Sequence, residues 1–323
     1  GIGGAISGLG SWLIPNPYWI IITGRLVQGI GASGAFPVVI PTVGDMFKEE
    51  SEISKSLGII ETSNTFGKVV SPILGSALAA LVWFAPFLAI TVFAAIAILL
   101  VAFLVKAPKK KEESNKENFK EFISKIKDIF KKKGKWITGI FVDGLVTMFV
   151  LFGFLFYFTS TLEDKYQING IKRGLIVAIP LLALCISSFI TGKVIGKRKV
   201  LMKWIILAGN ILAACSLVAL SFLDNFIMLI VTLSIAGVGI GAVLPCLDAL
   251  ITEGIEKQHR GTITSIYSSM RLLGVAVGPP VAAVLMKSNQ KTLFYILTAA
   301  NIAAIIFTLL LVRPKQNSAK AAK

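Results

Sequence analysis

Charged side chains are scarce in this sequence. Asp, Glu, Lys and Arg together make up 15% of its 323 residues, whereas 55% are hydrophobic. Soluble proteins carry about 25% charged residues, so this composition and a mean hydropathy of +0.79 exclude an ordinary water-soluble chain. The sequence has one histidine, His259, three cysteines without metal-ligand spacing, and no Gly-rich phosphate-binding loop. We therefore expect no metal site, no cofactor and no enzymatic activity, and ATP hydrolysis is not the expected energy source.

Long apolar stretches occupy most of the chain. Each holds about 20 residues, the length at which an α-helix crosses a hydrocarbon core about 30 Å thick while satisfying its own backbone hydrogen bonds. We predict an all-α, polytopic membrane protein with ten membrane-spanning helices: residues 1–14, 18–46, 53–82, 84–105, 136–161, 171–195, 202–223, 226–252, 261–286 and 292–312. The first is short and begins at Gly1, so we expect an upstream part of the protein to be missing.

Lysine and arginine predict the orientation. When alternate loops are assigned to alternate sides, 25 of the 33 Lys and Arg residues fall on one side and five on the other. Basic residues accumulate on the cytoplasmic side of membrane proteins, which places the central linker and the C-terminus in the cytoplasm. The net charge of +16 then reflects the topology of a cell-membrane protein, and nucleic-acid binding is not expected.

One long polar connection, residues 106–135, divides the chain. Apolar residues recur in it at three- and four-residue spacing: Phe119, Phe122, Ile123, Ile126, Ile129 and Phe130. This spacing predicts an amphipathic helix on the cytoplasmic leaflet that acts as a tether, with a regulatory or partner-binding role as the alternative. Residues 1–105 would be the remainder of an N-terminal bundle, with four helices present and two missing. Residues 136–323 would form a C-terminal six-helix bundle with a short basic tail.

The two parts of the chain repeat each other in the same direction. Residues 31–37 resemble residues 239–245 at an offset of 208. At an offset of 207, three residues of one part stand opposite three of the other: Gly67, Ser71 and Pro72 opposite Gly274, Gly278 and Pro279. Parallel repeats of six helices are one architecture of secondary transporters, so we predict two parallel pseudo-repeat bundles, ten helices here and twelve in the whole protein.

Two motifs resemble those of the major facilitator superfamily. Arg25, Gln28 and Gly29 match the Arg-x-x-Gln-Gly signature of that family's fourth helix. Residues 67–76 resemble the antiporter signature Gly-x-x-x-Gly-Pro-x-x-Gly-Gly of its fifth helix, with Ser71 and Ser76 in place of two glycines. The resemblance implies transport by alternating access and favours the drug:proton antiporter branch.

Ionisable side chains inside the predicted spans are the main candidates for function, because charge within a bilayer is costly. Arg25, with Gln28 one turn further on, would pair with a carboxylate or hold an anionic substrate group, and the resemblance implies a part in proton coupling. Its alternative is a structural hydrogen-bond hub. Glu61, Asn64 and Lys68 share one helix face, where Glu61 could accept and release a proton or could merely be buried polarity.

Five further acidic and basic residues are candidates. Asp143 could titrate or contact a cation, and the aromatic residues that follow it suit lipophilic cations, although simple packing is the alternative. Asp248 and Arg271 could form an ion pair that opens and closes with the conformation. Asp45 and Glu253 stand near helix ends, where they would lock the halves by salt bridges or be solvated.

Glycine and proline form a predicted conformational motif: Gly29, Gly67, Ser71, Pro72, Gly75, Gly274, Gly278 and Pro279. Small residues at four-residue spacing permit close helix approach, and proline kinks a helix. We expect a tight interface that can bend, although ordinary membrane packing needs the same residues.

The sequence therefore predicts a secondary active transporter that exports small amphiphilic molecules or drugs in exchange for protons. Its expected partners are the substrate, protons and the lipid bilayer, with no obligate protein partner. Export of a specific metabolite or siderophore is the alternative. A non-transporting binding protein, a membrane-embedded enzyme and a channel are weaker alternatives.

Overall fold

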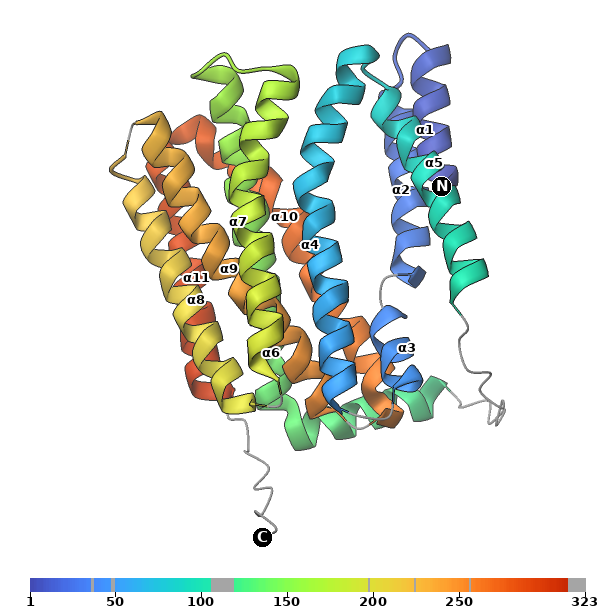
Figure 1. The fold of residues 1–323 in the computed structure, drawn as a ribbon, viewed down its shortest axis with the longest axis vertical. Coiled ribbons are helices and arrows are strands. Elements are labelled where there is room, and N and C mark those ends of the chain that lie inside the picture. The colour runs from blue at the N-terminus through green and yellow to red at the C-terminus, as the bar shows by residue number, and fades with distance from the viewer. Residues whose placement is uncertain are drawn as a thin grey trace.

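The protein is a set of long α-helices that stand side by side (Figure 1). The computed structural model describes residues 1–35, 38–47, 50–105, 119–196, 198–223, 225–255 and 257–312. Within these ranges the helices are α1 (Ile2–Leu13), α2 (Tyr18–Ala35), α3 (Val39–Met46), α4 (Glu50–Leu81), α5 (Ala85–Leu104), α6 (Phe119–Asp164), α7 (Gly170–Ile195), α8 (Lys199–Leu220), α9 (Phe226–Gly254), α10 (Lys257–Ser288) and α11 (Gln290–Leu311). The all-α prediction is confirmed.

Seven of these helices, α5 to α11, are long and apolar enough to cross a membrane. Three of the ten predicted membrane spans do not match a helix that is both long and apolar enough to cross a membrane. The first becomes α1, which has 12 residues, and the second is represented by two helices, α2, which ends at Ala35, and α3, which begins at Val39. The third, α4, has 32 residues but carries Glu61, Asn64 and Lys68 along its middle, and these polar side chains lower its hydropathy.

The second part of the chain packs around two hydrophobic clusters, of which one is the larger. Helices α6 to α11 bury a cluster that includes Leu151, Phe154, Phe158, Leu233 and Leu297. Glycines bring the helix backbones close together: a Cβ added at Gly209 would lie 2.5 Å from the carbonyl oxygen of Gly239 on the neighbouring helix. Such contacts between small residues are how helices associate where lipid removes the usual hydrophobic driving force.

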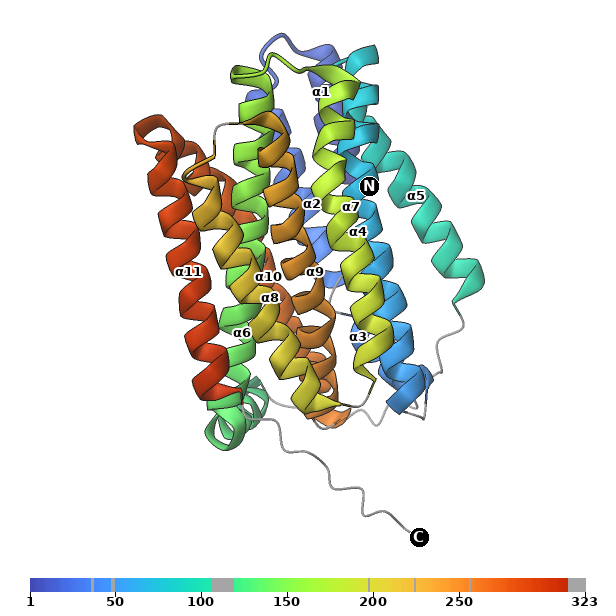
Figure 2. The same cartoon turned by 60° about the vertical axis from the view of Figure 1, so that its left-hand side comes forward.

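The first part of the chain is more open. Helices α1, α2 and α5 pack together, whereas α4 lies along α7 of the second part (Figure 2). This α4–α7 contact is close at two places. Gly58 faces Gly192, and a Cβ added at Gly174 would lie 2.6 Å from the carbonyl oxygen of Pro72. Helix α4 therefore connects the two parts of the protein through close approaches of its backbone to α7, and the division into two bundles stays a prediction.

The predicted tether begins a longer helix. Helix α6 starts at Phe119 and continues into the next span, so the amphipathic segment and that span are one helix. Figure 1 shows its beginning lying across the lower end of the bundle, which we call the linker end. Residues 106–118 lie outside the described ranges. Phe130 packs against Phe141 at 6.1 Å between ring centroids, which fixes this part of α6 to the core.

Candidate functional site

The most unusual feature of the interior is a cluster of three buried charges, which we call the ion cluster: Glu61 of α4, Asp248 of α9 and Arg271 of α10. Arg271 Nη1 donates to both carboxylate oxygens of Asp248, at 2.9 and 3.2 Å. Arg271 Nη2 donates to Glu61 Oε1 at 3.2 Å. All three residues are at most 6% exposed. A guanidinium with five donors arranged as a planar fork suits this double role.

The ion cluster joins helices that are far apart in the sequence. Glu61 and Arg271 are separated by 210 residues, yet their ion pair spans the space between α4 and α10. The two carboxylates share one guanidinium, so the cluster carries a formal charge of −1 when both are ionised. Removing one partner from a buried pair is strongly destabilising, because the other charge is left without compensation. A change in the protonation of Glu61 therefore acts directly on the contact between the two parts of the chain, whereas a change at Asp248 acts on it through the shared guanidinium.

A tyrosine that sequence reasoning did not single out completes the cluster. Tyr267 is fully buried one helical turn before Arg271, and the guanidinium carbon lies 5.7 Å from the centre of its ring. The negative face of an aromatic ring attracts a cation at this range. The spacing of four residues on one helix was the signal available in the sequence.

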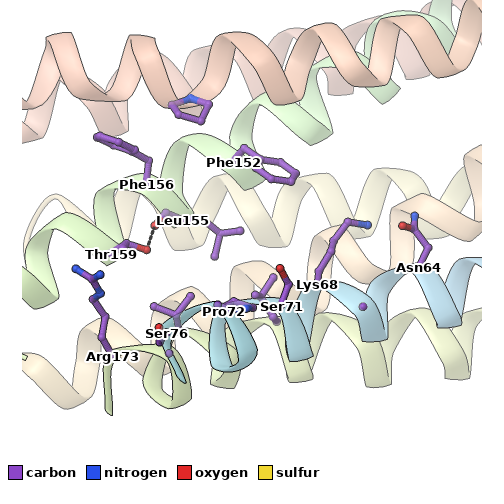
Figure 3. A pocket seen from close by; sticks show the side chains of 16 residues that line it. Asn64, Lys68, Ser71, Pro72, Ser76, Phe152, Leu155, Phe156, Thr159 and Arg173 are labelled. Carbon is purple, nitrogen blue, oxygen red and sulfur yellow. Dashed lines mark hydrogen bonds between the residues drawn. The ribbon is translucent and has the colours of Figure 1, made fainter. Parts of the chain in front are cut away.

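A cavity of about 750 Å³ lies between α4, α6 and α7, with Pro279 of α10 at its edge. Polar side chains and glycines from α4 form one wall: Asn64, Gly67, Lys68, Ser71, Gly75 and Ser76. Figure 3 shows Phe152 and Phe156 of α6 opposite this wall, Lys68 and Asn64 toward one end, and Arg173 and Thr159 toward the other. Its volume falls within the range of small-molecule sites.

Asn64 connects the cavity to the ion cluster. It lines the cavity, and its Nδ2 donates to Glu61 Oε2 at 3.3 Å. Lys68 lies one turn further along α4, also in the cavity wall, and its Nζ is buried without a hydrogen-bond partner among the described residues. The predicted face of Glu61, Asn64 and Lys68 thus runs from the ion cluster into the cavity.

Asp143 occupies a separate polar centre inside the second part of the chain. It is fully buried and accepts hydrogen bonds from Asn210 Nδ2 at 3.0 Å, Thr308 Oγ1 at 2.6 Å and Thr147 Oγ1 at 3.2 Å. Asn301 extends the network by donating to the carbonyl oxygen of Asn210 at 3.2 Å. These three partners of the carboxylate are neutral, and Asp143 does not line the cavity, so the structure places it with α8 and α11 rather than with Glu61.

Arg25 lies elsewhere. Its side chain is exposed on α2, where Nη1 donates to Gln28 Oε1 at 2.9 Å and the guanidinium lies 4.9 Å from the ring centre of Phe87. The expected pairing of Arg25 with a carboxylate is not found in the described part of the chain, because α2 packs mainly on α1 and the guanidinium of Arg25 lies against Phe87 of α5. The side chain of Asp45 lies outside the described residues, and Glu253 is near the end of α9.

The glycines of the conformational motif divide into two groups. On α10, Gly274 and Gly278 pack tightly against α6, where added Cβ atoms would lie 2.2 Å from Leu145 O and 2.9 Å from Phe149 O. On α4, Gly67 and Gly75 have nothing within 4 Å of an added Cβ, and the same holds for Gly29 on α2. The tight interface expected at Gly67 and Gly75 is therefore wrong for the described structure, because α4 turns this face toward the cavity.

Membrane-length helices that enclose a cavity beside buried ion pairs have the architecture of a small-molecule membrane transporter. The model of the Major Facilitator Superfamily matches residues 1–274 and, in a second match, residues 174–323. The chain belongs to this superfamily of transporters.

Individual relatives agree with this assignment. The chain is 50% identical to the bacillibactin exporter of Bacillus subtilis (strain 168) over 319 residues, which cover 98% of this chain and 79% of that protein. It is 25% identical to the class E tetracycline resistance protein of Escherichia coli, over 85% of this chain and 67% of that protein. Among solved structures, the human organic anion transporter MFSD10 (TETRAN) superposes with a TM-score of 0.66 at 16% identity, covering 95% of this chain and 74% of that one, which supports the fold.

Proposed function

We propose that this transporter exports a small amphiphilic molecule, with a siderophore as the leading candidate, in exchange for protons. The siderophore is supported by 50% identity to the bacillibactin exporter along almost the whole chain. The more distant tetracycline resistance protein supports the wider class of amphiphilic drugs, which the phenylalanines of the cavity would also accept. The linker end would face the cytoplasm of a cell-membrane protein, as the basic residues predict.

The observation that carries the proton coupling is the Glu61–Arg271 ion pair beside the cavity. The pair holds α4 against α10, so it stabilises the arrangement in which these helices are together. A proton on Glu61 would remove one of the two charges and weaken the contact. Loss of the proton would restore it. Glu61 would thus make the choice between two arrangements of the helices depend on proton binding, which is what alternating access with proton exchange requires.

The proposed cycle follows from the order of the residues along α4. Glu61 lies nearer the linker end than Lys68 and the rest of the cavity wall, because α4 begins at that end (Figure 1). With the ion pair formed, the helices are closed at the linker end and substrate leaves on the opposite side. A proton then reaches Glu61 through the cavity, the ion pair opens, and substrate enters from the linker end. Release of the proton to the cytoplasm re-forms the pair.

Transport by the full-length protein in proteoliposomes tests this function. A siderophore and a fluorescent lipophilic cation would be offered separately, with and without an imposed pH gradient. We expect gradient-dependent movement that is lost in Glu61→Gln and kept in Lys172→Gln, an exposed residue outside the cavity wall. Movement that persists in Glu61→Gln would place the proton elsewhere, Asp143 first. Binding of substrate without any movement would instead favour a non-transporting binding protein.

A further inference from the structure

The walls of the cavity carry charge of one sign. Among the described residues that line it, Lys68 and Arg173 are basic and none is acidic. Lys68 comes from α4 and Arg173 from α7, and Figure 3 shows them at opposite ends of the space with Phe152 and Phe156 between. The sequence patterns did not single out Arg173, which lies inside α7, whose first residue is Gly170. The cavity therefore combines two separated cations with an aromatic wall.

Lys68 is the stronger of the two anchors. Its Nζ is buried in the protein and has no hydrogen-bond partner among the described residues. The neighbouring acid, Glu61, attracts Lys68 electrostatically but is not hydrogen-bonded to it, and its carboxylate is already engaged by Arg271 and Asn64. A buried ammonium without a hydrogen-bonded counter-ion is costly, and a negative group on a ligand would relieve that cost.

Arg173 provides the second anchor with part of its donors. It forms an ion pair with Glu163, which lies outside the cavity lining and is about half exposed. A guanidinium has five donors, so this pair leaves others free for an oxygen of a ligand. Ser71, Ser76 and Thr159 add hydroxyl groups to the lining. These groups suit a ligand with oxygen acceptors at its ends and an apolar middle.

We propose that the cavity binds an anionic aromatic molecule, with its negative oxygens at Lys68 and Arg173 and its ring against Phe152 and Phe156. This inference rests on the proposed function and narrows its substrate class, away from the lipophilic cations that the aromatic residues alone suggested. It also gives Glu61 a second effect. Ionised Glu61 repels an anion held at Lys68 and favours its release, whereas neutral Glu61 strengthens the hold. Proton uptake would thus raise the affinity for the substrate before it is carried outward.

Binding to the purified protein in lipid nanodiscs tests the inference without transport. Three probes share one ring system and differ in charge: naphthalene sulfonate, naphthyl methanol and naphthylmethyl ammonium. We expect the sulfonate to bind about tenfold tighter than the neutral alcohol, and the ammonium more weakly than both. Lys68→Gln should remove that preference for the sulfonate and leave the alcohol unchanged, while Lys68→Arg and the control Lys172→Gln should keep it.

Glu61→Gln gives a result that a merely structural change would not. It should bind the sulfonate about threefold to tenfold tighter, because a repelling charge is removed, although it loses exchange. The inference would be overturned if the ammonium probe bound most tightly. It would also be overturned if Lys68→Gln weakened the binding of all three probes equally. Proton exchange with a preference for the ammonium would overturn it and leave the proposed function standing. The expected binding pattern without exchange in vesicles would support the binding site and overturn the transport proposal.

Discussion

Arg271 of α10 holds Glu61 of α4 at 3.2 Å while it holds Asp248 of α9 at 2.9 Å. One guanidinium thus compensates two buried carboxylates from different helices. Its loss removes both ion pairs, whereas the loss of either acid leaves one ion pair in place.

Arg271→Gln should therefore destabilise the protein more than Asp248→Asn does. We expect the free energy of unfolding to fall by about 3–5 kcal/mol in Arg271→Gln, as for other buried pairs that lose one partner. Asp248→Asn keeps the Glu61–Arg271 pair, so its free energy of unfolding should fall by less. Thermal unfolding in detergent measures both, and equal melting temperatures would contradict the shared role of Arg271.

Asp143 should prove structural. Asp143→Asn keeps one acceptor oxygen and should retain gradient-driven exchange, because the carboxylate is held by neutral donors away from the cavity. Asp143→Leu leaves Asn210 and Thr308 without their acceptor, at about 1–3 kcal/mol for each buried donor. Exchange assays and thermal unfolding on the two variants separate these effects. If Asp143→Asn abolished exchange in a well-folded protein, Asp143 would be the proton site instead.

The α4–α7 contact should not tolerate a methyl group at Gly174. An added Cβ would lie 2.6 Å from Pro72 O and 2.8 Å from Ser76 Oγ, so Gly174→Ala must push the helices apart. We expect a loss of about 1–3 kcal/mol, as for overpacked sites. Gly29→Ala is the matched control, since Gly29 has open space around it, and its stability should be unchanged or higher. If Gly174→Ala had the same melting temperature as the parent protein, this contact would be looser than the structure shows.

The orientation can be tested by labelling. Two exposed lysines can be replaced by cysteine for this purpose. Lys127 lies in α6 near the linker end, and Lys172 lies near the start of α7. In a chain whose own three cysteines are replaced by alanine, a membrane-impermeant maleimide should modify Lys172→Cys in whole cells. It should modify Lys127→Cys only after the membrane is opened. The reverse pattern would place the linker end outside.

Much of this fold follows from local sequence patterns. The apolar runs of α5 to α11 were predicted as helices because their length and composition leave no other solution in lipid. The pair of Asp248 and Arg271 was anticipated because charges buried in neighbouring spans need each other. The close approach at Gly274 and Gly278 also followed from four-residue spacing.

The rest depends on how distant helices pack. No local pattern could show that Glu61 meets Arg271, 210 residues later, or that α4 lies on α7 with Gly67 and Gly75 turned to open space. Arg25 looked equally buried in the sequence, yet α2 leaves it exposed. Arg173 was not singled out because a basic residue close to a turn is read as a topology signal, while its place in the cavity depends on how α7 packs against α4.

Asn64 stands in the wall of the cavity and donates to Glu61 at the same time. At this point one side chain, that of Asn64, separates the cavity from the ion cluster. A neutral compound that binds against the Asn64 amide would hold Glu61 in place without contacting any charged group. Inhibitors of this transporter consequently need not resemble its substrate in charge.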